Sequence, residues 1–130
     1  MIAKPVKNQF VDLIAQSKNG SGKTGAFSIG SLLRVDPKIQ KPQVLCVCHV
    51  RELSSQIAEV YEKLTKFSDI KVTNFTATGK AEGCQIVVTT LGKLQKQLQG
   101  GRGKQSLDLS ELRCFVVDEA DVFFREERNF

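Results

Sequence analysis

The sequence predicts an α/β domain of three layers, in which helices cover both faces of a mostly parallel sheet. Apolar stretches that suit buried strands alternate along the chain with stretches of helical periodicity, as in βαβ units. A glycine-rich loop at residues 20–24 (G-S-G-K-T) separates the first strand from the first helix, and an acidic pair follows the last strand. Because parallel strands hold ligands at their carboxyl ends, both features predict a binding site at that edge of the sheet.

The length and composition are those of one folded domain. The chain has 130 residues, of which 41% are hydrophobic and 25% are charged, enough to bury a single core. A net charge of +5 suits a polyanionic partner, although basic residues also solvate ordinary surfaces. No apolar run is long enough to cross a membrane, and residues 1–5 are not a secretion signal. We therefore expect a protein of the cytoplasm or the nucleus, without a membrane partner.

The four cysteines invite a metal or a disulfide interpretation. Cys46 and Cys48 alternate on one predicted strand and so face the same layer, while Cys84 and Cys114 stand elsewhere in the chain. The C-x₂-C spacing of zinc sites is absent. We expect all four to be free thiols in the core of a protein from a reducing compartment.

The first half of the chain contains two predicted strands and two predicted helices. The first strand is expected at residues 10–16, and the helix after the glycine-rich loop is expected to end near residue 35, just before Asp36-Pro37. Residues 43–49 are nearly all apolar, as in a parallel strand covered on both faces. Residues 51–67 form the clearest helix, with a predicted buried stripe at spacings of four and three that consists of Leu53, Ile57, Val60, Leu64 and Phe67.

The second half contains three further strands. They are expected at residues 70–76, 85–89 and 114–117. A tight polar loop is expected at residues 78–83, a solvated basic loop at residues 100–106 and a turn at residues 109–112. Thr90 is placed to cap a short helix, whose apolar residues are Leu91, Leu94 and Leu98.

The glycine-rich loop is the first candidate site. Such a loop wraps backbone N–H groups around a phosphate at the positive end of the following helix. Lys23 supplies a cation for the outer phosphates, and the Thr24 hydroxyl can hold Mg²⁺. The alternative is a glycine turn that only caps a helix. The full phosphate-loop pattern has glycine where this chain has Ser17. The predicted nucleotide-binding residues are Ser17, Lys18, Asn19, Gly20, Ser21, Gly22, Lys23 and Thr24.

The acidic pair Asp118 and Glu119 is the second candidate site. It follows an apolar strand, so both carboxylates are expected at the edge of the sheet that carries the phosphate loop. Phosphoryl transfer needs an acid that holds Mg²⁺ and a group that orients and deprotonates the attacking water. We assign Asp118 and Thr24 to the metal and Glu119 to the water. The predicted catalytic residues are Glu119, Lys23 and Asp118. The alternative is that the two acids only cap the next helix.

Residues 118–121 read D-E-A-D, and the chain resembles the first of the two RecA-like domains of DEAD-box RNA helicases. The stretch A-Q-S-x-x-G-S-G-K-T at residues 15–24 resembles motif I of that family, and V-V-D-E-A-D at residues 116–121 matches motif II. The resemblance covers nearly the whole chain and accounts for Ser17, since the family commonly has a small residue other than glycine there. It implies a RecA-like P-loop NTPase domain, ATP and Mg²⁺ as cofactors, and a role for Asp121 in coupling the motifs.

Three further stretches resemble the RNA-binding motifs of the family. They are Arg51-Glu52-Leu53, Thr78-Gly79 and Thr90-Leu91-Gly92-Lys93. In the family these motifs contact sugar and phosphate rather than bases. Lys93 stands where the family has arginine, so it lacks the bidentate fork of a guanidinium. The RNA-binding residues that the resemblance implies are Arg51, Gly79, Thr90, Gly92 and Lys93.

Several parts of the family pattern have no counterpart in the 130 residues: the adenine-reading Q motif, the S-A-T motif and the second RecA-like domain with its arginine fingers. We therefore expect residues 1–130 to be a partial, incomplete first domain that hydrolyses ATP poorly by itself. In this family the S-A-T strand lies beside the phosphate-loop strand, so we expect residues 10–15 to expose an apolar edge that lowers solubility. The motif I and L-L-R-V-D-P stretches most resemble the nuclear-pore mRNA-export helicases.

The sequence thus favours a piece of an ATP-dependent RNA helicase. Its expected partners are RNA, the second RecA-like domain and factors of mRNA export or translation. Two alternatives stay open: a non-catalytic half that binds nucleotide, RNA or a protein partner, and a P-loop ATPase that binds no RNA.

Overall fold

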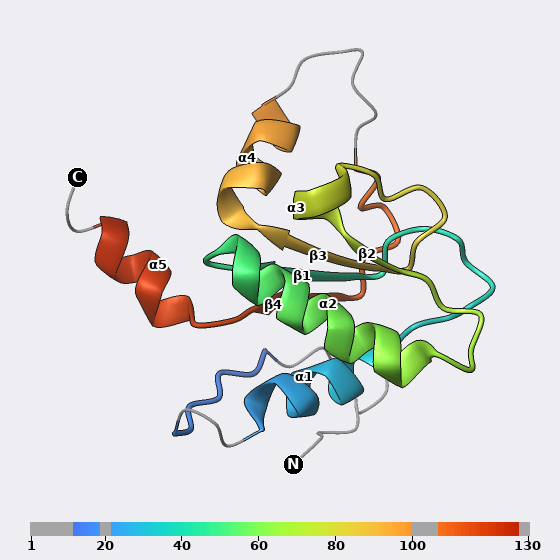
Figure 1. The fold of residues 1–130 in the computed structure, drawn as a ribbon, viewed down its shortest axis with the longest axis horizontal. Coiled ribbons are helices and arrows are strands. Elements are labelled where there is room, and N and C mark those ends of the chain that lie inside the picture. The colour runs from blue at the N-terminus through green and yellow to red at the C-terminus, as the bar shows by residue number, and fades with distance from the viewer. Residues whose placement is uncertain (1–11, 19–21, 100–106, 128–130) are drawn as a thin grey trace.

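The computed structural model describes residues 12–18, 22–99 and 107–127. A four-stranded sheet with the order β2-β3-β1-β4 runs through it, and each pair of neighbouring strands is parallel (Figure 1). The predicted α/β class with a parallel sheet is confirmed. The elements in chain order are α1 (Lys23–Leu32), β1 (Val44–Cys48), α2 (Arg51–Thr65), β2 (Val72–Asn74), α3 (Phe75–Thr78), β3 (Ile86–Thr90), α4 (Leu91–Gln99), β4 (Cys114–Val117) and α5 (Ala120–Glu127).

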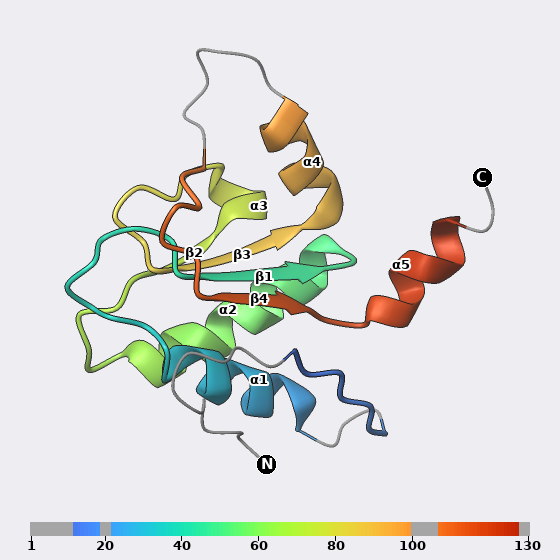
Figure 2. The same cartoon turned by 180° about the vertical axis from the view of Figure 1, so that it is seen from behind.

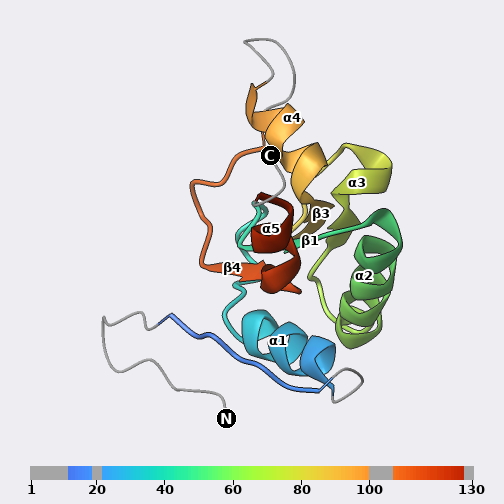
Figure 3. The same cartoon turned by 90° about the vertical axis from the view of Figure 1, so that its left-hand side faces the viewer.

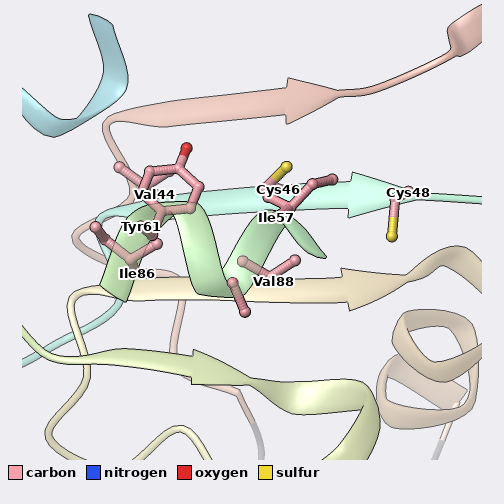
Figure 4. Packing of buried hydrophobic residues seen from close by; sticks show 8 residues of the cluster. Val44, Cys46, Cys48, Ile57, Tyr61, Ile86 and Val88 are labelled. Carbon is pink, nitrogen blue, oxygen red and sulfur yellow. The ribbon is translucent and has the colours of Figure 1, made fainter. Parts of the chain in front are cut away.

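The central strand β1 divides the core into two layers. All five of its residues are buried, and their side chains alternate between the faces of the sheet. Figure 4 shows Val44, Cys46 and Cys48 on the face that α2 covers, together with Ile86 and Val88 of β3. The remaining residues of β1 face α3 and α4 and pack with Phe75, Val87 and Leu94. The apolar run at residues 43–49 therefore forms the expected strand covered on both faces.

Helix α2 is present as predicted, but its buried face is turned from the predicted stripe. Ile57, Ala58 and Tyr61 are buried, whereas Leu64 is 42% exposed and Phe67 is 95% exposed. The helix ends at Thr65, so Phe67 no longer follows the helical period. The predicted stripe was wrong in its second half because the face that meets the sheet runs through Ser54, Ala58 and Thr65.

Helix α1 is held in place by polar contacts as well as by apolar packing. The hydroxyls of Ser31 and Tyr61 lie 2.7 Å apart in the buried layer between α1 and α2. The buried amide of Gln43 accepts a hydrogen bond from the N–H of Asp36 and donates to the carbonyl groups of Asp36 and Ile39. These contacts hold the C-terminal part of α1 against α2 and fix the loop after α1 to the start of β1.

Two predicted strands differ in the structure. Residues 12–16 form no strand, and Leu13 and Ile14 are 78% and 98% exposed; residues 10 and 11 lie outside the described part of the chain. The nearest edge strand is β4, and it does not pair with them, so their backbone has no ladder to join. The other expected strand, at residues 70–76, ends at Asn74, and Phe75 begins helix α3.

The remaining expectations are met in part. The turn at residues 109–112 is present, with a backbone hydrogen bond from Leu112 to Leu109, and α4 directly follows Thr90. Of the apolar residues of α4, Leu94 is buried and Leu98 is 65% exposed. The four cysteines are free, and Cys46 and Cys48 are buried while the other two are half-buried. Residues 100–106 lie outside the described ranges. Within those ranges, no helix has the length and apolar character to span a membrane.

Candidate nucleotide and nucleic-acid site

The predicted site residues follow the carboxyl ends of parallel strands, or begin α1, at one end of the molecule. In the sheet register Cys48 of β1 lies opposite Thr90 of β3, and Val47 lies opposite Val117 of β4. The loops after these strands therefore emerge side by side. Figures 1 and 2 show that the N-terminus of α1 lies at the same end of the molecule, because α1 runs opposite to the strands.

The start of α1 has the geometry of an anion site. Gly22 precedes the helix with φ 85°, a left-handed conformation that glycine adopts without steric cost. The first turn of α1 contains no acidic residue, so the positive end of the helix is not neutralised there. The ammonium of Lys23 donates a hydrogen bond to the carbonyl of Ser17 at 3.1 Å. Residues 19–21 of the predicted loop lie outside the described ranges.

The acidic pair lies at the end of β4. The N–H of Asp118 donates to the carbonyl of Val47 at 3.0 Å, which continues the ladder by one residue. The Asp118 carboxylate in turn accepts the N–H of Glu119 at 3.1 Å. Glu119 has φ 52° and is the only non-glycine residue with positive φ in the described part of the chain. Backbone strain of this kind concentrates at functional sites, and no sequence pattern predicted it at Glu119.

The structure places these groups at one edge without bringing them into contact. In the part of the chain that the structure describes, no hydrogen bond or ion pair joins Lys23 to Asp118 or Glu119. Asp121 instead forms an exposed ion pair with Arg125 at 3.4 Å within α5. The candidate nucleotide site is therefore a set of groups on one edge, in which the start of α1 and the acidic pair do not contact one another in the described part of the chain.

Cys48 is a neighbour of this site that sequence reasoning treated only as a core residue. Its thiol donates to the carbonyls of Val50 and Thr89, each at 3.5 Å. Burial, and then the negative charge of Asp118, raise the pKa of Cys48 from 9.0 to about 11. The thiol is therefore neutral and unreactive at neutral pH.

The predicted RNA-binding residues Gly79 and Lys93 are brought together. Gly79 ends α3 with φ 64°, and its N–H donates to the carbonyl of Phe75 at 2.8 Å. A Cβ atom on Gly79 would lie 3.5 Å from the Lys93 ammonium nitrogen. The same nitrogen lies 5.8 Å from the centre of the Phe75 ring. A glycine turn, a cation and an aromatic ring thus form one cluster, of which the sequence indicated the first two parts.

The other predicted RNA-binding residues lie close by. The N–H of Thr90 donates to the hydroxyl of Thr76 at 2.8 Å, so this backbone group is already used inside the protein. Gly92 is exposed, with no atom within 4 Å of the position that a Cβ would take. Arg51 is exposed at the first position of α2. The ring of His49, between β1 and α2, contacts Phe123 of α5 edge-on, with ring centres 6.0 Å apart.

The oxygen donors on this edge suit a magnesium ion held mainly by phosphates. Thr24 and Asp118 supply a hydroxyl and a carboxylate, the hard donors that Mg²⁺ prefers, and Mg²⁺ usually takes only one or two protein carboxylates beside phosphate and water oxygens. The described residues contain no group of three or more His, Cys, Asp or Glu side chains that could hold a metal ion by themselves. The residues present therefore fit a metal that arrives with a nucleotide.

The chain matches known proteins over most of its length. A family model described as DEAD/DEAH box helicase matches residues 2–130. The ATP-dependent RNA helicase DBP5 of Yarrowia lipolytica is 40% identical over 114 residues, which are 85% of this chain and 22% of that protein. The DEAD-box ATP-dependent RNA helicase 38 of Arabidopsis thaliana is 40% identical over 84% of this chain and 23% of its own length. The chain spans about a quarter of the length of these curated relatives.

Solved structures match at the level of the fold as well. Dbp5 of S. cerevisiae bound to RNA and ADP BeF3 gives a TM-score of 0.70 at 36% identity, over 83% of this chain and 28% of that one. A Dbp5 variant bound to Nup159, a Gle1 variant, IP6 and ADP gives 0.70 at 34% identity, over 85% and 29%. The yeast DEAD-box splicing factor Prp28 gives 0.74 at 28% identity, over 92% and 30%. The expected RecA-like fold is confirmed.

Proposed function

Because the chain belongs to the DEAD/DEAH box helicase family, we propose that it supplies the ATP-binding half and part of the RNA groove of an ATP-dependent RNA helicase. The observation that carries this proposal is the single edge on which the start of α1, the acidic pair and the Gly79–Lys93 cluster all lie. We assign residues 1–130 to part of the first RecA-like domain.

On the nucleotide side, each residue has a proposed task that its position supports. Lys23 exchanges the Ser17 carbonyl for the outer phosphates of ATP, because an anion attracts the ammonium more strongly than a neutral carbonyl does. Thr24 and Asp118 would hold Mg²⁺, which when bound neutralises the charge that develops on the phosphates. Glu119 orients the attacking water and accepts its proton. Asp121 couples the motifs once its exposed ion pair with Arg125 opens.

On the RNA side, the exposed Arg51 and the Lys93 cluster bind sugar and phosphate without reading bases. The solved relative bound to RNA and ADP BeF3 supports this assignment. By the same likeness we propose a role in mRNA export, in the nucleus or the cytoplasm, with protein partners similar to those named for the relatives, Nup159 and Gle1.

Two titrations test the proposal. We expect a fluorescent ATP analogue with Mg²⁺ to bind the chain, and Lys23→Ala to weaken binding at least about tenfold, since charge-assisted phosphate contacts are the strong ones. A fluorescent single-stranded RNA should bind more weakly to Arg51→Ala and to Lys93→Met. Lys63→Ala on the exposed face of α2 serves as the control and should change neither affinity.

The outcomes separate the alternatives. RNA binding without nucleotide binding supports the non-catalytic half. The exposed side chains of Leu13 and Ile14, beside the phosphate loop, also favour that alternative. Nucleotide binding without RNA binding supports a P-loop ATPase of another kind, and failure of both ends the proposal. We also propose that the chain by itself turns ATP over slowly, because an arginine finger contributes about 10³–10⁵ to the rate. RNA-stimulated turnover by the 130-residue chain would contradict this.

A further inference from the structure

We propose that Phe75 is a positioning residue for RNA binding, because its buried ring holds the ammonium of Lys93 beside Gly79, where an RNA phosphate meets it. This inference rests on the RNA-binding function proposed above. It adds a residue that touches no RNA itself and acts through Lys93.

The ring of Phe75 is a rigid support. It is 2% exposed and belongs to the core cluster that includes Leu45, Val87 and Leu94. Leu94 is the neighbour of Lys93 in α4, so the helix that carries the lysine packs on the same cluster as the ring. The Lys93 nitrogen lies 5.8 Å from the ring centre, within the range of a cation–π interaction.

Gly79 bounds the other side of the lysine. The point that a Cβ on Gly79 would occupy lies 3.5 Å from the ammonium nitrogen and 3.9 Å from the carbon that bears it. Because the N–H of Gly79 donates to the carbonyl of Phe75, one residue fixes the turn with its backbone and the cation with its side chain. Within the described ranges no carboxylate forms an ion pair with Lys93, so its charge stays available to an anion.

This support matters because lysine carries its charge on a flexible stem, whereas the arginine of the related motif has a rigid planar fork. Holding the stem between a ring and a glycine turn lowers the entropy that is lost when a phosphate binds. A second lysine–ring pair lacks a buried ring of this kind. Lys66 lies 5.5 Å from the ring of Phe67, but that ring is 95% exposed and is itself unsupported.

A double-mutant cycle tests the inference, with a fluorescent oligouridylate as the probe. We expect Phe75→Leu to weaken RNA binding about two- to fivefold, the range of an exposed to half-exposed cation–π contact, with the salt dependence unchanged because the charge remains. Lys93→Met should weaken binding and also lower the salt slope by about 0.7, the value for one phosphate contact on a single strand. The double variant should bind no more weakly than Lys93→Met.

Matched controls separate positioning from a loss of packing. Val87→Ala removes apolar volume from the same cluster without touching Lys93, and Phe67→Leu removes the exposed ring; neither should lower RNA affinity. If Phe75→Leu binds RNA as the unchanged chain does, or if the two losses simply multiply in the double variant, the inference is wrong. If Lys93→Met has no effect, the RNA contact proposed for Lys93 fails first, and the inference with it.

One measurement needs no folded variant. In the unchanged protein, NMR should show the protons next to the Lys93 ammonium shifted upfield by the Phe75 ring, relative to lysines that lie near no ring. An unshifted signal would overturn the placement of the cation, whatever the RNA affinity is.

Discussion

The two sides of the candidate site differ in how firmly they are built. On the RNA side, β1 and β3 are buried along almost their whole length and α2, α3 and α4 pack directly on them. On the nucleotide side, burial alternates along β4, where Phe115 is 57% exposed, and residues 12–18 are exposed throughout. Figures 1 and 3 show residues 12–18 at the periphery, and Figure 1 shows α5 projecting from one end of the sheet, with Phe123 packed against the core cluster.

The difference shows which part of the fold depends on contacts between elements that are far apart in the sequence. The RNA-side cluster joins Phe75, Gly79 and Lys93, which belong to the helices α3 and α4 on either side of β3 in the chain, and both helices pack on the same core cluster. The nucleotide site joins the start of α1 to the end of β4, two elements that are far apart in the sequence and do not pair in the sheet. Within the described residues, the proposed RNA side is therefore built from packed elements, whereas the proposed nucleotide side lies at β4, the last strand in the sheet order.

The largest expected effect contrasts the loss of stability at a buried residue of α2 with that at an exposed residue of β4. We expect Ile57→Ala in α2 to lower the free energy of unfolding by about 2–5 kcal/mol, because it opens a cavity in a buried layer. Phe115→Ala on the exposed face of β4 should cost less than about 1 kcal/mol, as surface substitutions usually do. Urea denaturation measures both, and equal losses would show that β4 is as firmly packed as β1.

Glycines with positive φ give the next contrast. Gly79→Ala should lower the free energy of unfolding by about 1–2 kcal/mol, the cost of a left-handed conformation for a residue with a side chain. Gly22→Ala should cost less in stability, because a Cβ there meets no neighbour within 4 Å whereas one on Gly79 meets Lys93 at 3.5 Å, but it should remove nucleotide binding. Gly92→Ala is the control, since Gly92 has neither positive φ nor a neighbour within 4 Å. A larger loss of stability for Gly22→Ala than for Gly79→Ala would reverse the comparison.

Strain at Glu119 predicts a smaller effect of opposite sign. Asparagine tolerates the left-handed region better than glutamate does, so Glu119→Asn should raise the free energy of unfolding by about 0.5–1 kcal/mol. Glu119→Gln keeps the strained backbone and should leave stability unchanged. Neither variant should support hydrolysis when the helicase is complete. Thermal unfolding and a phosphate-release assay give the two readouts, and a loss of stability in Glu119→Asn would contradict the account of strain.

The smallest expected effect is a change in the pKa of Cys48, at the end of β1, that depends on the charge of Asp118. Because burial and Asp118 raise the pKa of Cys48 from 9.0 to about 11, unfolded chains release this proton near pH 9 while folded ones keep it. The thiol therefore favours the fold fully below pH 9, and stability falls as the pH rises from 9 to 11. Asp118→Asn removes the smaller of the two causes, so the pKa of Cys48 should fall slightly. Alkylation rates against pH measure it, with Cys84 as the internal control, because burial and Lys71, and not Asp118, shift the pKa of that thiol.

The sequence predicted the parts of the fold that depend on local pattern. The apolar runs predicted β1, β3 and β4. The phosphate loop and the acidic pair predicted the edge of the sheet at which the candidate site lies. Of the strand expected at residues 10–16, the described residues 12–16 form none, because a strand exists only with a partner and no local pattern shows whether one is present. The pairing of Phe75 with Lys93 was missed for the same reason: it depends on α3 and α4 packing on one core cluster around Leu45 and Val87, which neither segment encodes by itself.

Strand β1 lies between β3 and β4, so it borders the loops that we propose for RNA and for ATP. On one flank its end lies level with Thr90, and on the other the carbonyl of Val47 binds the N–H of Asp118. Neighbouring strands are about 4.8 Å apart, so the loop after β3, proposed for RNA, and the acidic loop after β4, proposed for ATP, are separated by only two such steps. A small shift of β1 along its axis would therefore move both loops, and a change at one loop would reach the other through this one strand.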